Sequence, residues 1–297
     1  MLINNEFDDE TILSPWQYAW SIFKKKSFSM AAMWGCIILI LITLFADYII
    51  PHNPFAHYFT NILLPPSWLE NGNAMHLLGT DDLGRDSLSR LIKGIQLTLG
   101  GALTITVIIA LLGTIIGAAA AVTKGIKASV LHHLLDALLT IPTLLIAFIL
   151  IIIFGPSYDN CLIAVLLSLL PQFIRGIYVS IENEMHKQYV VALRLDGATY
   201  MRLMRFGILP NIVEPIITLF MRIFTMAILE IATLGYLGFG AQAAEIELGA
   251  LISTYIDLTY SSPWLVIIPG ITLSVIILLF NLFAEGLRLA IIEGEDA

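Results

Sequence analysis

Long stretches without a single charged residue constrain this chain more than any other feature. A membrane-spanning helix needs about 20 consecutive, mostly apolar residues. A stretch over 211–244 is apolar but carries Glu214, Arg222 and Glu230. Five further stretches contain no Asp, Glu, Lys or Arg at all: 28–46, 95–123, 137–158, 160–174 and 258–284. We therefore predict an all-α polytopic membrane protein with six transmembrane helices.

The composition excludes several other classes of protein. Only 13% of the 297 residues are charged, whereas a soluble domain carries about 25%. The mean hydropathy is +0.87. Fifteen Lys and Arg against 23 Asp and Glu give a net charge of −8, the wrong sign for a nucleic-acid surface. Cys36 and Cys161 lie in apolar stretches, and no Cys/His spacing typical of zinc is present, so we expect neither a disulfide framework nor a metal site.

Basic residues are distributed asymmetrically around the expected spans. With the N-terminus inside, the outer segments hold only Arg85, Arg90 and Lys93. The inner segments hold eleven: Lys24, Lys25, Lys26, Lys124, Lys127, Arg175, Lys187, Arg194, Arg202, Arg205 and Arg288. Because Lys and Arg gather on the cytoplasmic side, we expect both termini in the cytoplasm. In a bacterium, the spans would cross the inner membrane.

This topology divides the chain into segments. No small-residue cleavage site follows the first span, so we expect an uncleaved anchor rather than a signal peptide. Within the second span, Gly113 and Gly117 form a small-x3-small pattern that predicts close helix packing. The expected segments are a cytoplasmic tail over 1–27, a first transmembrane helix over 28–50, a periplasmic segment over 51–94, a membrane core over 95–288 and a cytoplasmic tail over 289–297.

The inner connection over 186–210 has the pattern of a docking element. A short helix over 189–195 precedes Gly197, and a basic helical piece over 198–206 follows it. Pro210 is expected to end that second piece, because proline cannot continue a helix. An inert basic loop that only sets topology is the alternative reading of these residues.

Two segments resemble one known family. Residues 189–210 are similar to the signature cytoplasmic loop of ABC-importer permeases. Val191, Leu193 and Gly207 stand where that signature has Glu, Ala and Ile. The matching positions are Ala192, Gly197, Leu209 and Pro210. Residues 76–91 resemble the segment before the second span of the C-type subunits of dipeptide and oligopeptide permeases, and the loops 64–67, 194–198 and 240–242 resemble the Sap branch of that family.

The resemblance implies a type I importer permease fold with its core over 95–288 and a coupling loop at about 186–210. It implies a homologous partner permease, two cytoplasmic ATPase subunits that bind the ATP, and a periplasmic peptide-binding protein. The expected function is peptide uptake, including antimicrobial peptides; haem, nickel or polyamine is the alternative cargo. No cofactor or catalytic residue is expected in this chain. The expected ATPase-coupling residues are Ala192, Arg194, Asp196, Gly197, Ala198, Leu209 and Pro210.

Charges inside the fifth span are the candidates for the translocation path. A charged side chain near the bilayer centre costs at least about 2.5–3.5 kcal/mol. Arg222 and Glu230 are eight residues apart, which places them about 80° apart around a helix, so both could face one cavity. An interhelical ion pair or a polar contact with the partner permease is the alternative.

The outer segment contains a glycine spacing that could be mistaken for a nucleotide site. Gly79 and Gly84 have the spacing of a P-loop, but Arg85 and Asp86 replace its Lys and Ser/Thr. We expect instead a capped turn in which Asp81 and Asp82 are the caps.

Two other classes of protein are alternatives to a transport subunit: an intramembrane enzyme, and an autonomous channel or carrier. Neither would depend on separate ATPase subunits, so that dependence distinguishes them from an importer permease.

Overall fold

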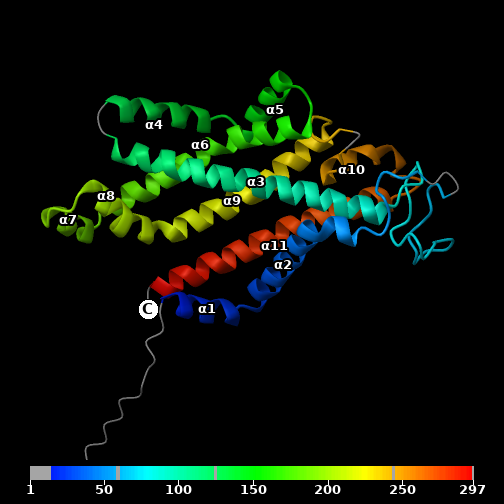
Figure 1. Cartoon of the computed structure of the whole chain (residues 1–297), viewed down its shortest axis with the longest axis horizontal. Helices are drawn as coiled ribbons and strands as arrows, with labels where there is room; N and C mark the ends of the chain where they lie inside the picture. The colour runs from blue at the N-terminus through cyan, green and yellow to red at the C-terminus, as the bar shows by residue number, and fades with distance from the viewer. Residues whose placement is uncertain (1–14, 58–60, 124–125, 243–244, 296–297) are drawn as a thin grey trace, which may run out of the picture.

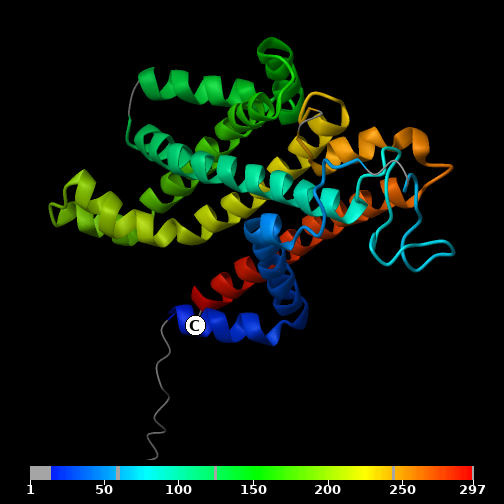
Figure 2. The same cartoon turned by 45° about the vertical axis from the view of Figure 1, so that its right-hand side comes forward.

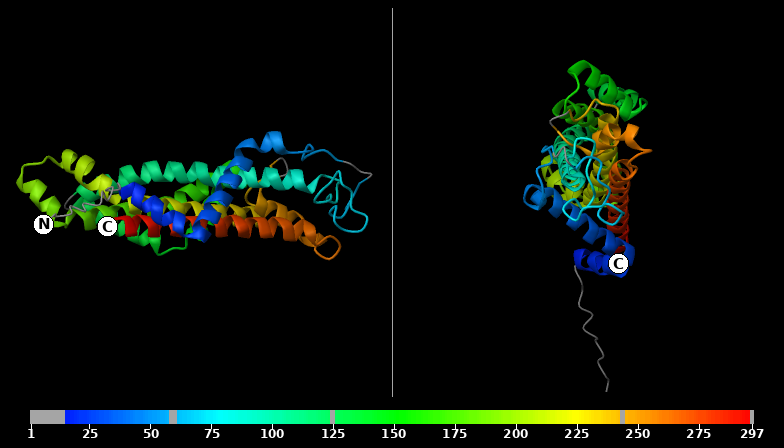
Figure 3. Two further views of the ribbon diagram at one scale, coloured as in Figure 1. Left: turned by 90° about the horizontal axis from the view of Figure 1, so that it is seen from below. Right: turned by 90° about the vertical axis from the view of Figure 1, so that its right-hand side faces the viewer.

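Helices make up most of the described part of the chain, as the long apolar runs predict. In the computed structural model, residues 15–57, 61–123, 126–242 and 245–295 are described, and no strand occurs among them. Within these described ranges, five helical segments are long and apolar enough to cross a membrane. They are α2 (Ser27–Ile49), α3 (Ser87–Val122), α6 (Tyr158–Met185), the continuous stretch 200–236 that contains α9 (Val213–Tyr236), and α11 (Trp264–Glu295). Four of them run roughly along one direction and give the molecule an elongated shape, and the fifth, α2, crosses them at a steep angle (Figures 1 and 3).

The predicted third span is broken rather than straight. The structure divides it into α4 (Ile126–Leu139) and α5 (Thr143–Phe154), which meet at an angle of 91°. The break falls at Pro142, which precedes α5 and disfavours a helical conformation at Ile141. The predicted number of six spans therefore holds only when this bent pair counts as one span.

Two other helices are longer than the charge-free stretches suggested. Helix α3 begins at Ser87 because the Asp86 carboxylate accepts a hydrogen bond from the Ser89 N–H and caps it. Helix α6 continues past Arg175, whose guanidinium lies 3.3 Å from the Asp136 carboxylate of α4. A charged residue therefore marks the end of neither helix.

Small residues allow α3 and α6 to pack closely. A Cβ at Gly113 would lie 2.5 Å from the ring of Phe173, and one at Gly117 would lie 2.9 Å from the backbone oxygen of Ile174. Phe173 and Ile177 of α6 are fully buried there. The small-x3-small pattern of the sequence is therefore a helix-packing surface, as expected.

The elongated bundle has two distinct ends (Figure 3). One, the α7 end, carries α7 (Gln188–Leu195), α8 (Tyr200–Arg202) and the C-terminal part of α11. There α1 (Pro15–Lys25) lies against α11 (Figure 2), with the Phe23 ring 6.0 Å from that of Phe283. The other, the loop end, carries the long connection between α2 and α3, together with the segment that joins α10 (Leu248–Thr254) through η3 (Ile256–Leu258) to α11.

Candidate functional site

The α7 end projects as a helical tip whose turn requires glycine. After α7 ends, Gly197 adopts a φ of +80°, a conformation that side chains other than glycine rarely take. The Gly197 N–H donates to the Arg194 carbonyl, and the Ala198 N–H donates to the Leu193 carbonyl, each at 3.1 Å. This pair of bonds is a Schellman motif, which ends a helix and reverses the chain. The helix–glycine–helix pattern predicted from sequence is therefore a tight, defined turn.

A polar cluster fixes α7 to the two long helices beside it. The Tyr189 hydroxyl donates to Glu184 Oε1 of α6 at 2.7 Å. Asn211 Nδ2 donates both to that hydroxyl oxygen (3.0 Å) and to the Gly207 carbonyl (2.9 Å). Burial raises the pKa of Tyr189; the hydrogen bond from Asn211 lowers it, and the neighbouring Glu184 carboxylate raises it further. These hydrogen bonds join α7 to α6 and to the turn η2 (Leu209–Ile212), which leads into α9. No pattern in the sequence indicated this cluster.

The tip exposes apolar side chains. We call residues 188–206 the coupling tip. Leu195 is 83% exposed, Met201 78% and Phe206 72%. The guanidiniums of two arginines lie over aromatic rings of the same tip, Arg194 over Tyr200 and Arg205 over Phe206. Exposed apolar groups that are rimmed by charge are typical of a protein-binding surface.

The predicted coupling residues divide between the surface of the tip and its base. Five of them lie in or beside the turn, and Leu209 and Pro210 lie at the base in the 3-10 turn η2 (Leu209–Ile212). Leu209 and Ala198 are half-buried, and the other five are exposed: Ala192, Arg194, Asp196, Gly197 and Pro210.

The expectation that Pro210 ends the second helical piece is wrong. The chain remains helical from α8 through the π-helical turn η1 (Leu203–Ile208) and η2 into α9. The change from a wide to a narrow turn beside Pro210 lets the chain pass the missing N–H without leaving the helix.

Glu230 lies inside the helix bundle rather than on its surface. The carboxylate is 5% exposed and accepts hydrogen bonds from the hydroxyls of Thr143, at the start of α5, and Ser168 of α6, the latter at 3.1 Å. Arg222 of the same helix is exposed and makes no ion pair with a described residue. The structure therefore does not bring the two charges together: Glu230 joins three helices, and Arg222 faces outward.

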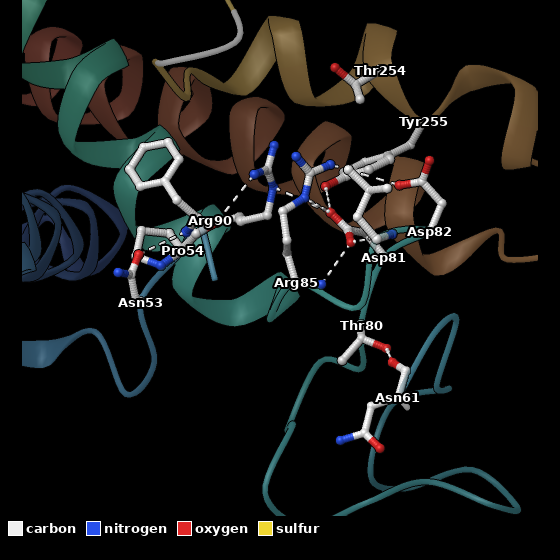
Figure 4. A network of polar contacts seen from close by, with 12 residues as sticks. Asn53, Pro54, Asn61, Thr80, Asp81, Asp82, Arg85, Arg90, Thr254 and Tyr255 are labelled. Carbon is white, nitrogen blue, oxygen red and sulfur yellow. Dashed lines mark hydrogen bonds and ion pairs between the residues drawn. The ribbon is translucent and has the colours of Figure 1, made fainter. Parts of the chain in front are cut away.

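The loop end contains a buried ionic network around Asp81 (Figure 4). Asp81 is fully buried and accepts hydrogen bonds from Arg85 Nε at 2.6 Å and from the Tyr255 hydroxyl at 2.8 Å. Arg90 lies 3.7 Å from the same carboxylate and donates to the Pro54 carbonyl at 3.3 Å. Asp81 thus ties α3 and the connection before it to the segment after α10.

The predicted helix caps require a correction. Asp81 accepts from the N–H groups of Leu83 and Arg85, so it stabilises the turn before α3, but α3 itself is capped by Asp86. Asp82 is not a cap: its carboxylate is half-exposed and lies 3.7 Å from Arg85. The sequence correctly indicated a capped turn here but assigned the helix cap to the wrong aspartates.

A second buried carboxylate, Glu247, joins α10 to α3. One oxygen accepts from the Ala250 N–H at 2.6 Å, and the other accepts from the Gly249 N–H at 3.0 Å and the Thr98 hydroxyl at 3.4 Å. Burial raises the pKa of Glu247 from 4.5 to about 7, although these three donors lower it. The sequence did not indicate a role for this residue, because it lies in the polar connection between α9 and α10.

This raised pKa predicts a pH dependence of stability. Between about 4.5 and about 7 the folded state holds a proton on Glu247 that the unfolded state has released. The free energy of unfolding should therefore fall as pH rises through this interval and stay level above it. Thermal unfolding in detergent should have a higher midpoint at pH about 5 than at about 8, and Glu247→Gln should weaken this difference. An equal difference in the variant would contradict the assignment to Glu247.

Three residues that are separated in the sequence and could act as metal ligands meet at the loop end. Spacing along the chain predicted no metal site, but the fold brings His52, His76 and Asp86 together there. One ligand atom of each lies within 4.8 Å of the others.

Comparison with known proteins defines the class. A family profile described as "Binding-protein-dependent transport system inner membrane component" matches residues 110–291. A second, "N-terminal TM domain of oligopeptide transport permease C", matches residues 14–66. The chain belongs to the family of binding-protein-dependent transport system inner membrane components. The resemblance drawn from the coupling loop and from residues 76–91 is thereby confirmed.

Particular relatives agree with this class. The chain is 41% identical to the "Peptide transport system permease protein SapC" of Escherichia coli over 94% of each chain. It is 36% identical to the "Dipeptide transport system permease protein DppC" of Haemophilus influenzae over 93% of each chain. An inward-facing structure of the MetNI methionine ABC transporter matches 69% of this chain and 97% of its own, with a TM-score of 0.58 at 18% identity. The structural match confirms the permease fold.

Proposed function

We propose that this chain is a permease subunit of an ATP-driven importer and that it forms, with a homologous permease, a path for peptide uptake across the bacterial inner membrane. The coupling tip carries this proposal, because it presents exposed apolar side chains on a rigid turn that is joined to two long helices. The named relatives are peptide permeases, which favours peptides over haem, nickel or polyamine.

In this proposal, two separate ATPase subunits bind the ATP and receive the coupling tip at the cytoplasmic face. When the ATPase pair closes, the tip moves with it. Tyr189 passes the movement to α6 through Glu184 and to the start of α9 through Asn211. The spans then exchange between an outward-facing and an inward-facing state, whose populations are set by the nucleotide.

The orientation follows from the charges at the two ends. Lys24, Lys26 and the arginines of the coupling tip lie at the α7 end, which suits the cytoplasmic side. Both termini are then cytoplasmic, and the loop end with the Asp81 network lies in the periplasm, where a peptide-binding protein would deliver cargo. This orientation also supports placement in the inner membrane.

The two charges of α9 act on the path differently. Arg222 is exposed in the single subunit and is available to the path or to the partner permease. Glu230 holds α5 and α6 through Thr143 and Ser168, at the bend of the broken span. We place Glu230 beside the path, where it sets the position of this bend.

Glu230→Ala is expected to lower peptide uptake about tenfold, because two buried hydroxyls lose their acceptor. Copurification of the ATPase subunits should be unchanged, since the coupling tip is remote from this residue along α9. Glu230→Gln is the matched control, because its side-chain oxygen still accepts from one hydroxyl, and it should retain more uptake than the alanine variant. Unchanged transport kinetics in Glu230→Ala would remove Glu230 from the path.

Affinity copurification of the full chain tests the proposed partners. We expect a second permease and two ATPase subunits, and a ligand screen on the associated binding protein should select peptides. Recovery of the chain without an ATPase would overturn the proposed partners. Selection of haem, nickel or a polyamine by the binding protein would overturn the proposed peptide cargo.

A further inference from the structure

Three residues from separate parts of the chain meet at the loop end. His52 follows the end of α2, His76 lies in the connection before α3, and Asp86 is the cap of α3. His76 and Asp86 are buried, and the His52 side chain is 23% exposed. The three side chains come together only in the folded chain, so the spacing of residues along the sequence does not indicate the group.

The distances within this group suit a divalent metal ion. His76 Nδ1 and Asp86 Oδ1 are hydrogen-bonded at 2.9 Å, and His52 Nδ1 lies 3.9 Å from the other carboxylate oxygen, Asp86 Oδ2. The two imidazole rings are 4.9 Å apart. A tetrahedral zinc ion with bonds of about 2.0–2.2 Å separates its ligand atoms by about 3.3 Å. The observed separations lie on both sides of that value, so small side-chain rotations would close the group around an ion.

The chemistry of the three donors favours zinc. Two imidazoles and one carboxylate are common zinc ligands, whereas magnesium and calcium prefer a shell of oxygens. The partly exposed side of His52 leaves room for water as a fourth ligand. Ser89 holds the carboxylate from behind, since its N–H and hydroxyl both donate to Asp86 Oδ2, at 2.8 and 2.6 Å. Such a second layer of hydrogen bonds orients metal ligands.

The charge balance around Asp86 points the same way. The neighbouring buried Asp81 has two arginines, Arg85 and Arg90, as ionic partners. The ion pairs of Asp86 with described residues are both with histidines, and imidazole is itself a common zinc ligand. The start of α3 also favours the negative charge of Asp86.

We propose that His52, His76 and Asp86 form a zinc-binding site that joins the end of α2, the connection before α3 and the start of α3. The ion acts as a structural clip for the loop end and leaves one ligand position to water. The site is independent of the cargo and of the coupling tip, so its test does not depend on the proposed function.

The test uses the full chain, purified in detergent without a polyhistidine tag and stripped with a chelator. One Zn²⁺ should bind per chain and raise the thermal unfolding midpoint, whereas Mg²⁺ should not. Co²⁺ in place of Zn²⁺ should give the visible absorption of a tetrahedral site, a readout that needs no variant. An unchanged midpoint and no Co²⁺ absorption would show that the group is only a hydrogen-bonded network, and this would overturn the proposal.

Variants assign the site to its ligands. His52→Ala should weaken Zn²⁺ binding by at least about tenfold, and the partial exposure of His52 makes the substitution tolerable for folding. His186→Ala is the matched control, because His186 is exposed at the α7 end, and it should bind Zn²⁺ like the original chain. Equal Zn²⁺ affinity in His52→Ala and the original chain would exclude the site.

Discussion

Gly197→Trp is expected to abolish peptide uptake, with a fall of at least about 100-fold, which corresponds to about 2.7 kcal/mol. The position of a Cβ on Gly197 has no neighbouring atom within 4 Å in this chain. The indole would therefore project from the coupling tip into the space proposed for the ATPase, without a clash inside the permease. Membrane insertion and the amount of protein should stay close to those of the original chain.

Backbone strain is a separate effect that a second variant controls. The φ of +80° at Gly197 costs a side chain other than glycine about 1–2 kcal/mol, and asparagine tolerates it best. Gly197→Asn should therefore keep uptake, because its short side chain adds little bulk to the tip. Equal loss in both variants would indicate that strain, rather than docking, explains the defect. Normal uptake in Gly197→Trp would contradict the coupling role of the tip.

Asp81→Ala is expected to lower the free energy of unfolding by about 3–5 kcal/mol, because it leaves buried arginines without their carboxylate. Asp81 is fully buried, and Arg85 and Arg90 are themselves largely buried beside it. The Tyr255 hydroxyl also loses its acceptor. Unfolding of the purified chain in detergent measures this change.

Its matched control is the adjacent aspartate. Asp82→Ala should change the free energy of unfolding by no more than about 0.5 kcal/mol, since its half-exposed carboxylate lies 3.7 Å from Arg85. The two variants remove the same charge from neighbouring positions, so net charge cannot explain a difference between them. Similar effects of both would contradict the network as the element that holds the loop end together.

Local patterns predicted those features that depend on neighbours along the chain. The helices around Gly197 could be foreseen because a glycine between two short helical segments indicates a turn, and the structure shows the Schellman motif there. Gly113 and Gly117 likewise indicated close packing. The bend at Pro142 carried a signal in its proline, but the surrounding charge-free run favoured a single straight span.

Features that depend on tertiary contacts were missed. Arg175 suggested a helix end in the sequence, yet α6 continues to Met185, and Arg175 forms an ion pair with Asp136 of α4. Glu230 and Arg222 could share a face by spacing alone, but packing buries one and leaves the other exposed. No sequence pattern predicted the role of Glu247, because its burial and its hydrogen bond from Thr98 depend on the packing of α10 against α3.

Uptake of a labelled peptide into proteoliposomes tests the central claim most directly. The full chain is reconstituted with its copurified partner permease, ATPase subunits and binding protein, and uptake is measured with ATP, without ATP and with an ion gradient alone. We predict uptake that requires both ATP and the ATPase subunits and that is lost in Gly197→Trp. Peptide uptake by the purified chain alone under an ion gradient would contradict the assignment of this chain as a permease subunit.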